Sequence, residues 1–309
     1  MILATAALAA GFASAIDGSN IVGYGNANFT YSTGAKLITP FFLSTDQTSK
    51  IRLSDIKVTG YEENEESCGE VWIDELDEVG RTKQVDDGEG GKINVRYVWW
   101  DKPTGPVWDP PKAAGWYDIN DTPLKDGESP LGNANEILIT AGDSFYAYGT
   151  GDWQAKFQVA GAVNANKLVM EFPYSTGAKA LGNAFPTARH LSDFYVTGYE
   201  ENEESCGEVW IDELDEVGRT KQVDDGEGGK INVRYVWWDK PTGPVWDPPK
   251  AAGWYDANEN PLKDGESPLG NANEIVVQPG DGFWAYGTSD WQAYLNVNKL
   301  DLDINKDVE

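Results

Sequence analysis

One long stretch of the sequence occurs twice. Residues 58–118 read VTGYEENEESCGEVWIDELDEVGRTKQVDDGEGGKINVRYVWWDKPTGPVWDPPKAAGWYD, and the same letters recur without substitution at residues 196–256. After a short divergent segment, residues 123–137 are identical to residues 261–275. Such repetition is typical of proteins that use one surface twice, as assembly subunits and multivalent binders do. A recent duplication that has not yet diverged would give the same pattern.

The repeat divides the chain into two domains of ordinary size. The chain has 309 residues with 13 Trp, 14 Tyr and 10 Phe, so each half has enough apolar side chains for a core. We expect a leader at residues 1–15, domains at 16–160 and 161–295, and an extra strand at 296–309. The repeat also includes YSTGAK, at residues 31–36 and 174–179, but the first strands of the two copies differ. This difference indicates similar cores with different neighbours.

Strand signals dominate the chain. Short runs of β-branched and aromatic residues lie between clusters of Gly, Pro, Asn and Asp, at residues 21–31, 92–99, 136–140, 144–148 and 153–159. No stretch outside the leader has the periodicity of a long amphipathic helix. The sequence therefore predicts an all-β protein made of two tandem antiparallel β-sandwich domains that arose by internal duplication.

The ends of each repeat carry a resemblance. The closing strands read DSFYAYG at residues 143–149 and DGFWAYG at residues 281–287, and the opening strand contains NIVGY at residues 20–24. These segments resemble the terminal strands of uncharacterised secreted β-domains of bacterial surface proteins. The resemblance implies a β-domain repeat and carries no activity with it.

Charge and the leader indicate the environment. The formal net charge is −27, which repels nucleic acid and anionic lipid and excludes both as partners. Residues 1–15 are hydrophobic and end in Ala13-Ser14-Ala15, the small-x-small pattern that signal peptidase cleaves. No other hydrophobic run approaches the length of a membrane span, so we expect no membrane insertion of the mature chain. These features predict a secreted protein, extracellular or on the cell surface.

The two cysteines, Cys68 and Cys206, occupy equivalent positions in the two copies. One cysteine in each repeat does not suit a disulfide within each domain. The alternatives are a disulfide between the copies, a disulfide between chains, or two inert buried thiols.

Tryptophans gather around a proline-rich segment in each copy, as WWDKPTGPVWDPPKAAGWY at residues 99–117 and again at residues 237–255. Proline stiffens such a segment, so it can hold flat rings in fixed positions. The rings can form a subunit interface, stack against sugars, or turn inward to cover the end of the domain. The candidate interface or sugar platform comprises Trp99, Trp100, Trp108, Trp116, Trp237, Trp238, Trp246 and Trp254.

The C-terminal tail has the pattern of a half-buried strand, because Leu300, Leu302 and Ile304 alternate with polar residues. NVNKL at residues 296–300 is similar to NANKL at residues 164–168, so the tail looks like the first strand of an absent third repeat. Such a strand pairs with an edge of its own chain or completes the next chain, and the second arrangement builds a head-to-tail filament.

Acidic residues offer candidate calcium ligands in two places. The dense run at residues 62–78, repeated at 200–216, is either a solvated acidic face or a surface that cations neutralise. In the tail, Asp301, Asp303, Asn305 and Asp307 have the opening spacing of an EF-hand loop. The loop departs from that pattern at its sixth position, where Lys306 replaces glycine, and calcium is therefore an expectation rather than a requirement.

Catalytic motifs are lacking in the sequence. The single histidine, His190, has no counterpart in the first repeat, and no phosphate-binding loop or zinc-ligand cluster is present. We therefore expect a protein that is not an enzyme: a secreted structural subunit that polymerises with itself into an extracellular filament or surface layer. The alternative is a divalent carbohydrate-binding adhesin that uses the two Trp/Pro segments to bind glycans.

Overall fold

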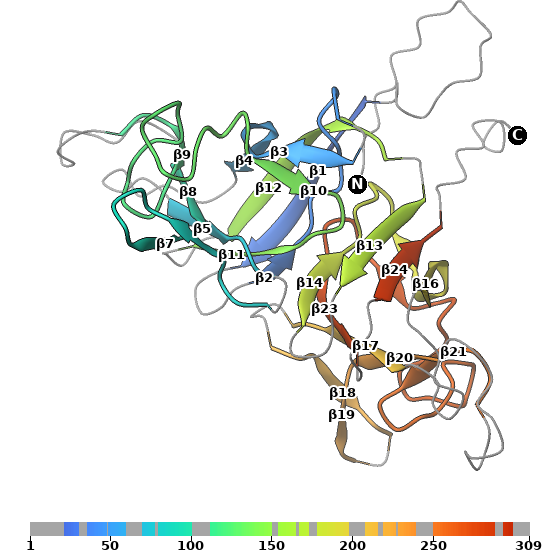
Figure 1. Cartoon of the computed structure of the whole chain (residues 1–309). Coiled ribbons are helices and arrows are strands. Elements are labelled where there is room, and N and C mark those ends of the chain that lie inside the picture. Colours follow the sequence, from blue (N-terminus) through green and yellow to red (C-terminus); the bar gives the residue numbers. More distant parts are fainter. Residues whose placement is uncertain are drawn as a thin grey trace, which may run out of the picture.

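The structure is a computed structural model of the chain, and the statements below concern the residues that it describes. These are residues 22–30, 36–47, 49–59, 70–77, 80–100, 112–149, 154–164, 167–172, 178–197, 208–215, 219–226, 228–238, 250–287 and 293–298. They form an all-β structure of antiparallel sheets (Figure 1). The helical elements among them are two single-turn 3₁₀ helices, η2 (Leu53–Asp55) and η3 (Leu191–Asp193).

The first half contains strands β1 to β12. They are β1 (Val22–Thr30), β2 (Lys36–Ile38), β3 (Lys50–Arg52), β4 (Ile56–Thr59), β5 (Glu70–Asp74), β6 (Gln84–Asp86), β7 (Lys92–Asn94), β8 (Arg96–Trp100), β9 (Gly115–Tyr117), β10 (Leu138–Thr140), β11 (Phe145–Gly149) and β12 (Gln154–Ala162). They form a three-stranded sheet of order β1-β12-β4, a five-stranded sheet of order β2-β11-β5-β8-β9, and the pairs β6-β7 and β10-β3.

Strands of the second half follow the same plan. They are β13 (Leu168–Phe172), β14 (Lys179–Gly182), β15 (Arg189–His190), β16 (Phe194–Thr197), β17 (Glu208–Glu213), β18 (Gln222–Asp224), β19 (Lys230–Asn232), β20 (Arg234–Trp238), β21 (Gly253–Asp256), β22 (Val276–Val277), β23 (Gly282–Gly287) and β24 (Ala293–Val297). Their sheets have the orders β13-β24-β16, β14-β23-β17-β20-β21, β18-β19 and β15-β22. The two halves therefore have matching sheets with matching strand order.

The predicted strand at residues 92–99 is two strands in the structure. Val95 separates β7 from β8, and its backbone N–H donates to the carbonyl of Lys83 at 2.8 Å. The carbonyl of Val95 accepts a hydrogen bond from the N–H of Glu75 at 3.0 Å. Because its two backbone groups bond to different neighbours, Val95 passes the chain from the β6–β7 pair into the five-stranded sheet. The residue types alone carry no signal of this break.

The last strand of the second half includes the start of the expected tail. Asn296 and Val297 belong to β24, which lies between β13 and β16 in the middle of its sheet. In the first half the same central place belongs to β12, which continues to Ala162. The boundaries expected at 160/161 and 295/296 therefore fall inside strands rather than between them. Residues 299–309 lie outside the described part of the chain.

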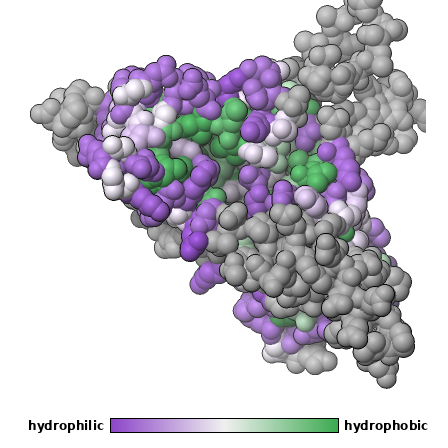
Figure 2. Space-filling view, viewed as in Figure 1, coloured by the Kyte–Doolittle hydropathy of each residue, from purple (hydrophilic) through white to green (hydrophobic). Residues whose placement is uncertain are grey.

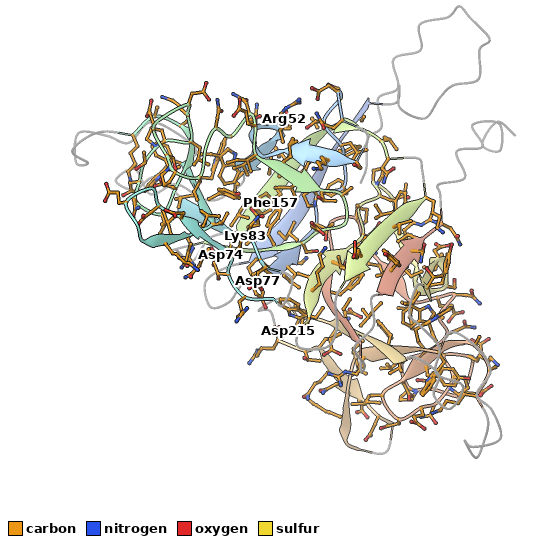
Figure 3. The ribbon with its side chains drawn as sticks, viewed as in Figure 1. Arg52, Asp74, Asp77, Lys83, Phe157 and Asp215 are labelled. Atoms are coloured by element: carbon orange, nitrogen blue, oxygen red, sulfur yellow. The ribbon has the colours of Figure 1, made fainter. Side chains whose placement is uncertain are left out.

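The three-stranded and five-stranded sheets of each half contribute side chains to one core. In the first half, Phe145 of β11 meets Phe157 of β12 edge-on, with ring centroids 5.5 Å apart. In the second half, Phe194 of β16 and Phe283 of β23 make the same kind of contact at 6.1 Å. Most buried hydrophobic residues of the two halves belong to one continuous cluster, in which Phe157 is 1% exposed, and each half has a smaller separate cluster around Trp100 or Trp238. Figure 3 shows Phe157 in the middle of the first half.

Phe157 provides a direct test of the packing between the sheets. We expect Phe157→Ala to lower the free energy of unfolding by about 3–5 kcal/mol, because the change removes a fully buried ring and leaves a cavity. The matched control is Phe157→Leu, since the second half holds Leu295 at the equivalent place in β24, and its loss should be clearly smaller. Chemical denaturation of both variants measures the difference, and equal losses would contradict the account.

Candidate functional site

The aromatic strands turn most of their tryptophan rings inward. Trp100 at the end of β8 is 2% exposed and Trp116 of β9 is 6% exposed, and their counterparts Trp238 and Trp254 have the same exposures. Trp116 donates its indole N–H to the carbonyl of Ile56 at 3.0 Å, which ties β9 to the three-stranded sheet. These rings are therefore core residues and cannot stack on a ligand without leaving the core.

Trp99 and its counterpart Trp237 are the partly exposed members of the described set. Trp99 packs edge-on against Trp116 with ring centroids 5.0 Å apart, and Trp237 packs against Trp254 at 5.1 Å. The indole Nε1 atoms of Trp99 and Trp237 are buried and make no hydrogen bond to the described residues. Each ring is thus held in one orientation by its neighbour.

A hollow of about 330 Å³ lies beside Trp237. Its wall combines an aromatic ring with hydrogen-bonding groups of Ser192, Lys263, Asn271 and Asn273. Because the residues that line it come mainly from the segments shared by the two copies, the first repeat holds the corresponding side chains. This combination of a flat ring with amide, hydroxyl and ammonium groups suits a polar ring-shaped ligand.

The ends of the two Trp/Pro segments are fixed by a repeated contact. Lys112 lies over the ring of Trp100 at 4.2 Å from its centroid and pairs with Asp121 at 2.6 Å. Lys250 lies over Trp238 at the same distance and pairs with Glu259 at 2.8 Å. The cation–π contact and the ion pair together anchor the point where each segment rejoins the sheet.

Several predicted residues lie outside the described part of the chain. They are Trp108, Trp246, Cys68, Cys206, the tail residues Leu300, Leu302 and Ile304, and the candidate calcium ligands Asp301, Asp303, Asn305 and Asp307. The disulfide, the exchanged tail and the calcium loop therefore stay predictions. Within the described residues, no group of three or more His, Cys, Asp or Glu side chains is placed to hold a metal ion.

The two halves meet through a junction that sequence reasoning did not identify. Backbone hydrogen bonds cross it in both directions: Thr39 N–H donates to the Gly280 carbonyl at 2.9 Å, and Gly182 N–H donates to the Gly142 carbonyl at 3.0 Å. Isolated β-bridges join Ile38 to Asp281 and Asp143 to Leu181. β2 therefore lies against the residues that precede β23, and β14 lies against the residues that precede β11.

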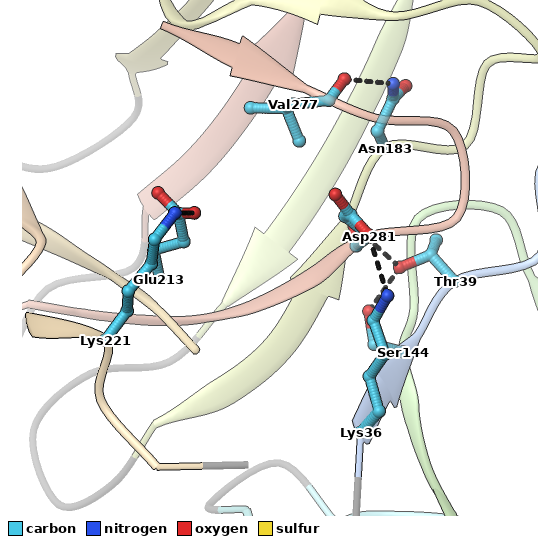
Figure 4. Close-up of polar contacts among 8 residues, drawn as sticks. All are labelled: Lys36, Thr39, Ser144, Asn183, Glu213, Lys221, Val277 and Asp281. Carbon is cyan, nitrogen blue, oxygen red and sulfur yellow. Dashed lines mark hydrogen bonds and ion pairs between the residues drawn. The ribbon is translucent and has the colours of Figure 1, made fainter. Parts of the chain in front are cut away.

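Two ion pairs also cross the junction, and each half contributes a lysine to one and an aspartate to the other. Lys36 of the first half pairs with Asp281 of the second at 3.2 Å, and Lys179 of the second pairs with Asp143 of the first at 3.1 Å (Figure 4 shows the first pair). Burial raises the pKa of Asp143, and the opposing Lys179 ammonium lowers it. These pairs are a third exposed, so they orient the junction more than they stabilise it.

Ring contacts and hydroxyls complete the junction. Tyr146 meets its own counterpart, Trp284, edge-on with ring centroids 5.7 Å apart. The hydroxyls of Thr39 and Ser144 hydrogen-bond to each other, and Thr39 also approaches the Asp281 carbonyl at 3.5 Å (Figure 4). Because equivalent residues face each other, the junction resembles a two-fold dimer contact formed within one chain.

Two cavities flank the junction and are built from equivalent residues. One, of about 190 Å³, lies in the second half beside Lys36, and the other, of about 550 Å³, lies in the first half beside Lys179. Asp77 lines the larger cavity and its counterpart Asp215 lines the smaller, and Figure 3 places both where the halves meet. Each half thus completes a cavity of the other with a lysine.

A tyrosine–glutamate pair forms the floor of each cavity. Tyr97 donates its hydroxyl to Glu75 at 2.7 Å, and Tyr235 donates to Glu213 at the same distance. Burial, followed by the nearby carboxylate, raises the pKa of both phenols above the ordinary value, so they stay protonated donors. Lys83 pairs with Glu75 at 2.5 Å, which leaves the carboxylate fully engaged.

The single histidine has a structural place. His190 is exposed in the two-residue strand β15, and its side chain accepts a hydrogen bond from the backbone of η3. Its backbone N–H donates to the Asp193 carboxylate at 3.0 Å. His190 therefore caps η3, a local role that explains its position without a reaction.

Much of the surface is hydrophilic. Figure 2 shows hydrophobic residues gathered in a few patches on the face in view, and the exposed large hydrophobic residues include Leu138, Val169 and Val276. The described residues contain no helix that is long and apolar enough to cross a membrane. No family model, curated protein or solved structure matches the chain.

Gly182 tests the junction. A Cβ atom there would lie closer than 3.0 Å to Thr39 Oγ1 and to the Asp281 carbonyl oxygen. We expect Gly182→Ala to lower the free energy of unfolding by about 1–3 kcal/mol, because Thr39 of the facing half and the Asp281 carbonyl of the same half must both shift to admit the methyl group. Val169→Ala, at a side chain 52% exposed, is the control and should change it by less than about 0.5 kcal/mol.

A double-mutant cycle identifies the contact that is responsible. Thr39→Gly removes one of the two groups that the new methyl would meet, so the double variant should recover part of the loss. Denaturation of the four proteins measures the coupling. Additive effects of the two changes would contradict a direct contact between positions 39 and 182.

Proposed function

We propose that the chain is a secreted structural protein of two tandem antiparallel β-sandwich domains, and that it is a subunit of an extracellular filament or surface layer. The observation that carries the proposal is the junction that joins β2 to the residues before β23 and β14 to the residues before β11, and so holds the two similar halves together. A building block needs repeated contact surfaces at a constant spacing, and two joined halves with long identical segments supply them.

The sandwich arrangement is supported by the contacts between sheets. Phe145 and Phe157 come from different sheets of the first half and meet in its core. The Trp116 indole of the five-stranded sheet donates to the backbone of η2–β4, beside the three-stranded sheet. Two sheets that share a buried layer of this kind form a sandwich.

Inward tryptophans favour an assembly role over a sugar platform. Trp100, Trp116, Trp238 and Trp254 are between 2% and 6% exposed, so their rings stabilise the domains. What remains outside is a mostly charged surface with a net charge of −27 for the whole chain. Chains of like charge associate only when salt or bound cations offset the repulsion, and calcium is suited to carboxylate surfaces.

The tail provides the test of assembly. Residues 299–309 follow β24 directly, and the proposal assigns them to strand exchange with the next chain. We expect the mature chain to form regular filaments or sheets by electron microscopy, more readily with calcium, and a chain lacking residues 299–309 to remain as single particles. The deletion begins after the end of β24 at Val297, and circular dichroism of the shortened chain checks its fold.

The matched control keeps the length of the tail and removes its apolar pattern. Leu300→Ser, Leu302→Ser and Ile304→Ser together should prevent assembly as the deletion does. Unchanged particle size in both variants would remove strand exchange from the proposal. Dispersed particles of the unaltered chain under every condition would remove the assembly function.

A second candidate is a divalent carbohydrate-binding adhesin, and the hollow beside Trp237 favours it. The rigid junction would hold two such hollows apart at a constant distance, so that binding of one raises the effective concentration at the other. Asn273 lines the hollow with an amide that can hydrogen-bond to a sugar hydroxyl, whereas the Asn271 amide is engaged with Asp264 and the backbone N–H of Asn273.

Substitution of the partly exposed rings tests this candidate. We expect Trp99→Leu or Trp237→Leu alone to reduce the avidity for a glycan array by one to two orders of magnitude, and the double variant to abolish binding. Circular dichroism confirms the fold of each variant, and Val169→Ala serves as the control. Absence of binding by the unaltered chain at millimolar sugar would remove the adhesin.

A further inference from the structure

The two copies differ where they face each other. The long identical segments lie in the bodies of the two halves, whereas β2 differs from β14 and the start of β11 differs from the start of β23. At the junction, five pairs of equivalent positions hold different residues in the first and second halves: Leu37 and Ala180, Ile38 and Leu181, Thr39 and Gly182, Ser144 and Gly282, and Tyr146 and Trp284. The backbone contacts of the junction are therefore related by an approximate two-fold axis, but the side chains at equivalent positions of the two halves differ.

The side-chain differences are complementary. Thr39 and Ser144 both come from the first half and bond to each other, and the equivalent positions of the second half are both glycine. A Cβ on Gly182 would collide with Thr39 Oγ1, and a Cβ on Gly282 would come within 3.0 Å of Leu37 Cβ and Ser144 Oγ. The hydroxyls of one half occupy the space that the glycines of the other leave empty.

This complementarity favours contact between a first half and a second half over contact between two like halves. If a first half met another first half, the positions of Gly182 and Gly282 would hold Thr and Ser, and both collisions would occur. If two second halves met, the hydroxyl pair would be absent and the contact would lose its packing. Unlike halves alone satisfy both the space and the hydrogen bonds of the junction.

One chain contains only one first half, so contacts between like halves arise only between chains. Side chains that clash when two first halves meet therefore prevent a contact between separate chains. In an isolated chain that contact cannot form, so the clash would have nothing to prevent. In addition, the backbone hydrogen bonds Thr39–Gly280 and Gly182–Gly142, both bridges and both ion pairs join residues of different halves, and the halves are linked along the chain only through residues 163–167. Nothing in the contact itself requires both halves to come from one chain.

We propose that the junction is also the surface through which chains join, and that in joined chains the second half of another copy takes the place of the chain's own second half. Thr39, Ser144, Gly182 and Gly282 determine the specificity, so that joined chains run first half to second half in one direction. This inference rests on the proposed function, because it names the contact and polarity of the assembly. Exchange of an identical element between copies is an accessible route to such contacts.

Disulfide trapping in the full chain tests the proposal. Ile38 and Asp281 are bridge partners, and paired antiparallel residues have Cα atoms about 4.5–5.5 Å apart, within the range that a disulfide spans. Two differently tagged chains, each with Cys68→Ser and Cys206→Ser, carry Ile38→Cys in one and Asp281→Cys in the other. They are mixed in denaturant, refolded together at rising concentration and oxidised.

The expected result is a disulfide between the two tags that increases with concentration. The matched like pairing, Ile38→Cys in one chain with Asp143→Cys in the other, should yield at least about tenfold less, because it requires two first halves to meet. A symmetric pair, Asp143→Cys with Leu181→Cys, repeats the test at the other bridge if either of the first variants folds poorly.

Two outcomes overturn the proposal. Equal yields for like and unlike pairs would show that the four positions do not discriminate. Failure of both unlike pairs to link separate chains, while Ile38→Cys and Asp281→Cys in one chain do form a disulfide, would show that the junction closes only within a chain.

The test is separable from the assembly function. Filaments that form without disulfides between tags would leave the assembly standing and remove this contact from it. Linked pairs from a chain that builds no filament or layer would support the junction as a contact between chains and remove the larger assembly.

Discussion

The pairing of β2 with the residues before β23, and of β14 with the residues before β11, is the contact on which the arrangement of the molecule depends. A strand at the edge of a sheet exposes unpaired backbone groups that attract other strands. Here the two five-stranded sheets present such edges to each other, and the hydrogen bonds from Thr39 to Gly280 and from Gly182 to Gly142 satisfy part of them. The ion pairs, the contact of Tyr146 with Trp284 and the two flanking cavities all follow from this placement. These contacts join the two similar halves with an approximate two-fold relation.

The tryptophans explain the stability of each body more than its function. Trp116 and Trp254 each join two sheets through an indole hydrogen bond, and Lys112 and Lys250 fix the ends of the Trp/Pro segments by lying over buried rings. Aromatic side chains that are used in this way give a small domain a large buried area. The chain as a whole has a net charge of −27, so electrostatic contacts at its surface depend on ionic strength.

Part of this architecture was predictable from the sequence. The alternation of apolar and polar residues and the dense turns predict the all-β character, which the structure confirms, and the predicted strand at 144–148 corresponds to β11. The break at Val95 was not predictable, because it depends on backbone hydrogen bonds to Lys83 and Glu75. These residues are distant from Val95 along the chain, and the local residue types do not reveal the contacts. The junction was missed because its residues are ordinary lysines, aspartates and glycines whose importance lies in what faces them. The sequence carries one signal of the junction: the two copies differ in β2 and β14, although the long segments that follow are identical. From the sequence alone, this difference indicates only that the two domains have different neighbours.

The central claim is that the junction holds the two halves as one rigid body, and a distance measurement tests it most directly. Spin labels at Lys125→Cys and Lys263→Cys, equivalent exposed positions in the two halves, would be placed in a chain with Cys68→Ser and Cys206→Ser. Pulsed electron paramagnetic resonance should then give one narrow distance distribution, which broadens when Gly182→Ala is added. A broad distribution in the chain without Gly182→Ala would show that the halves move independently and would contradict the account.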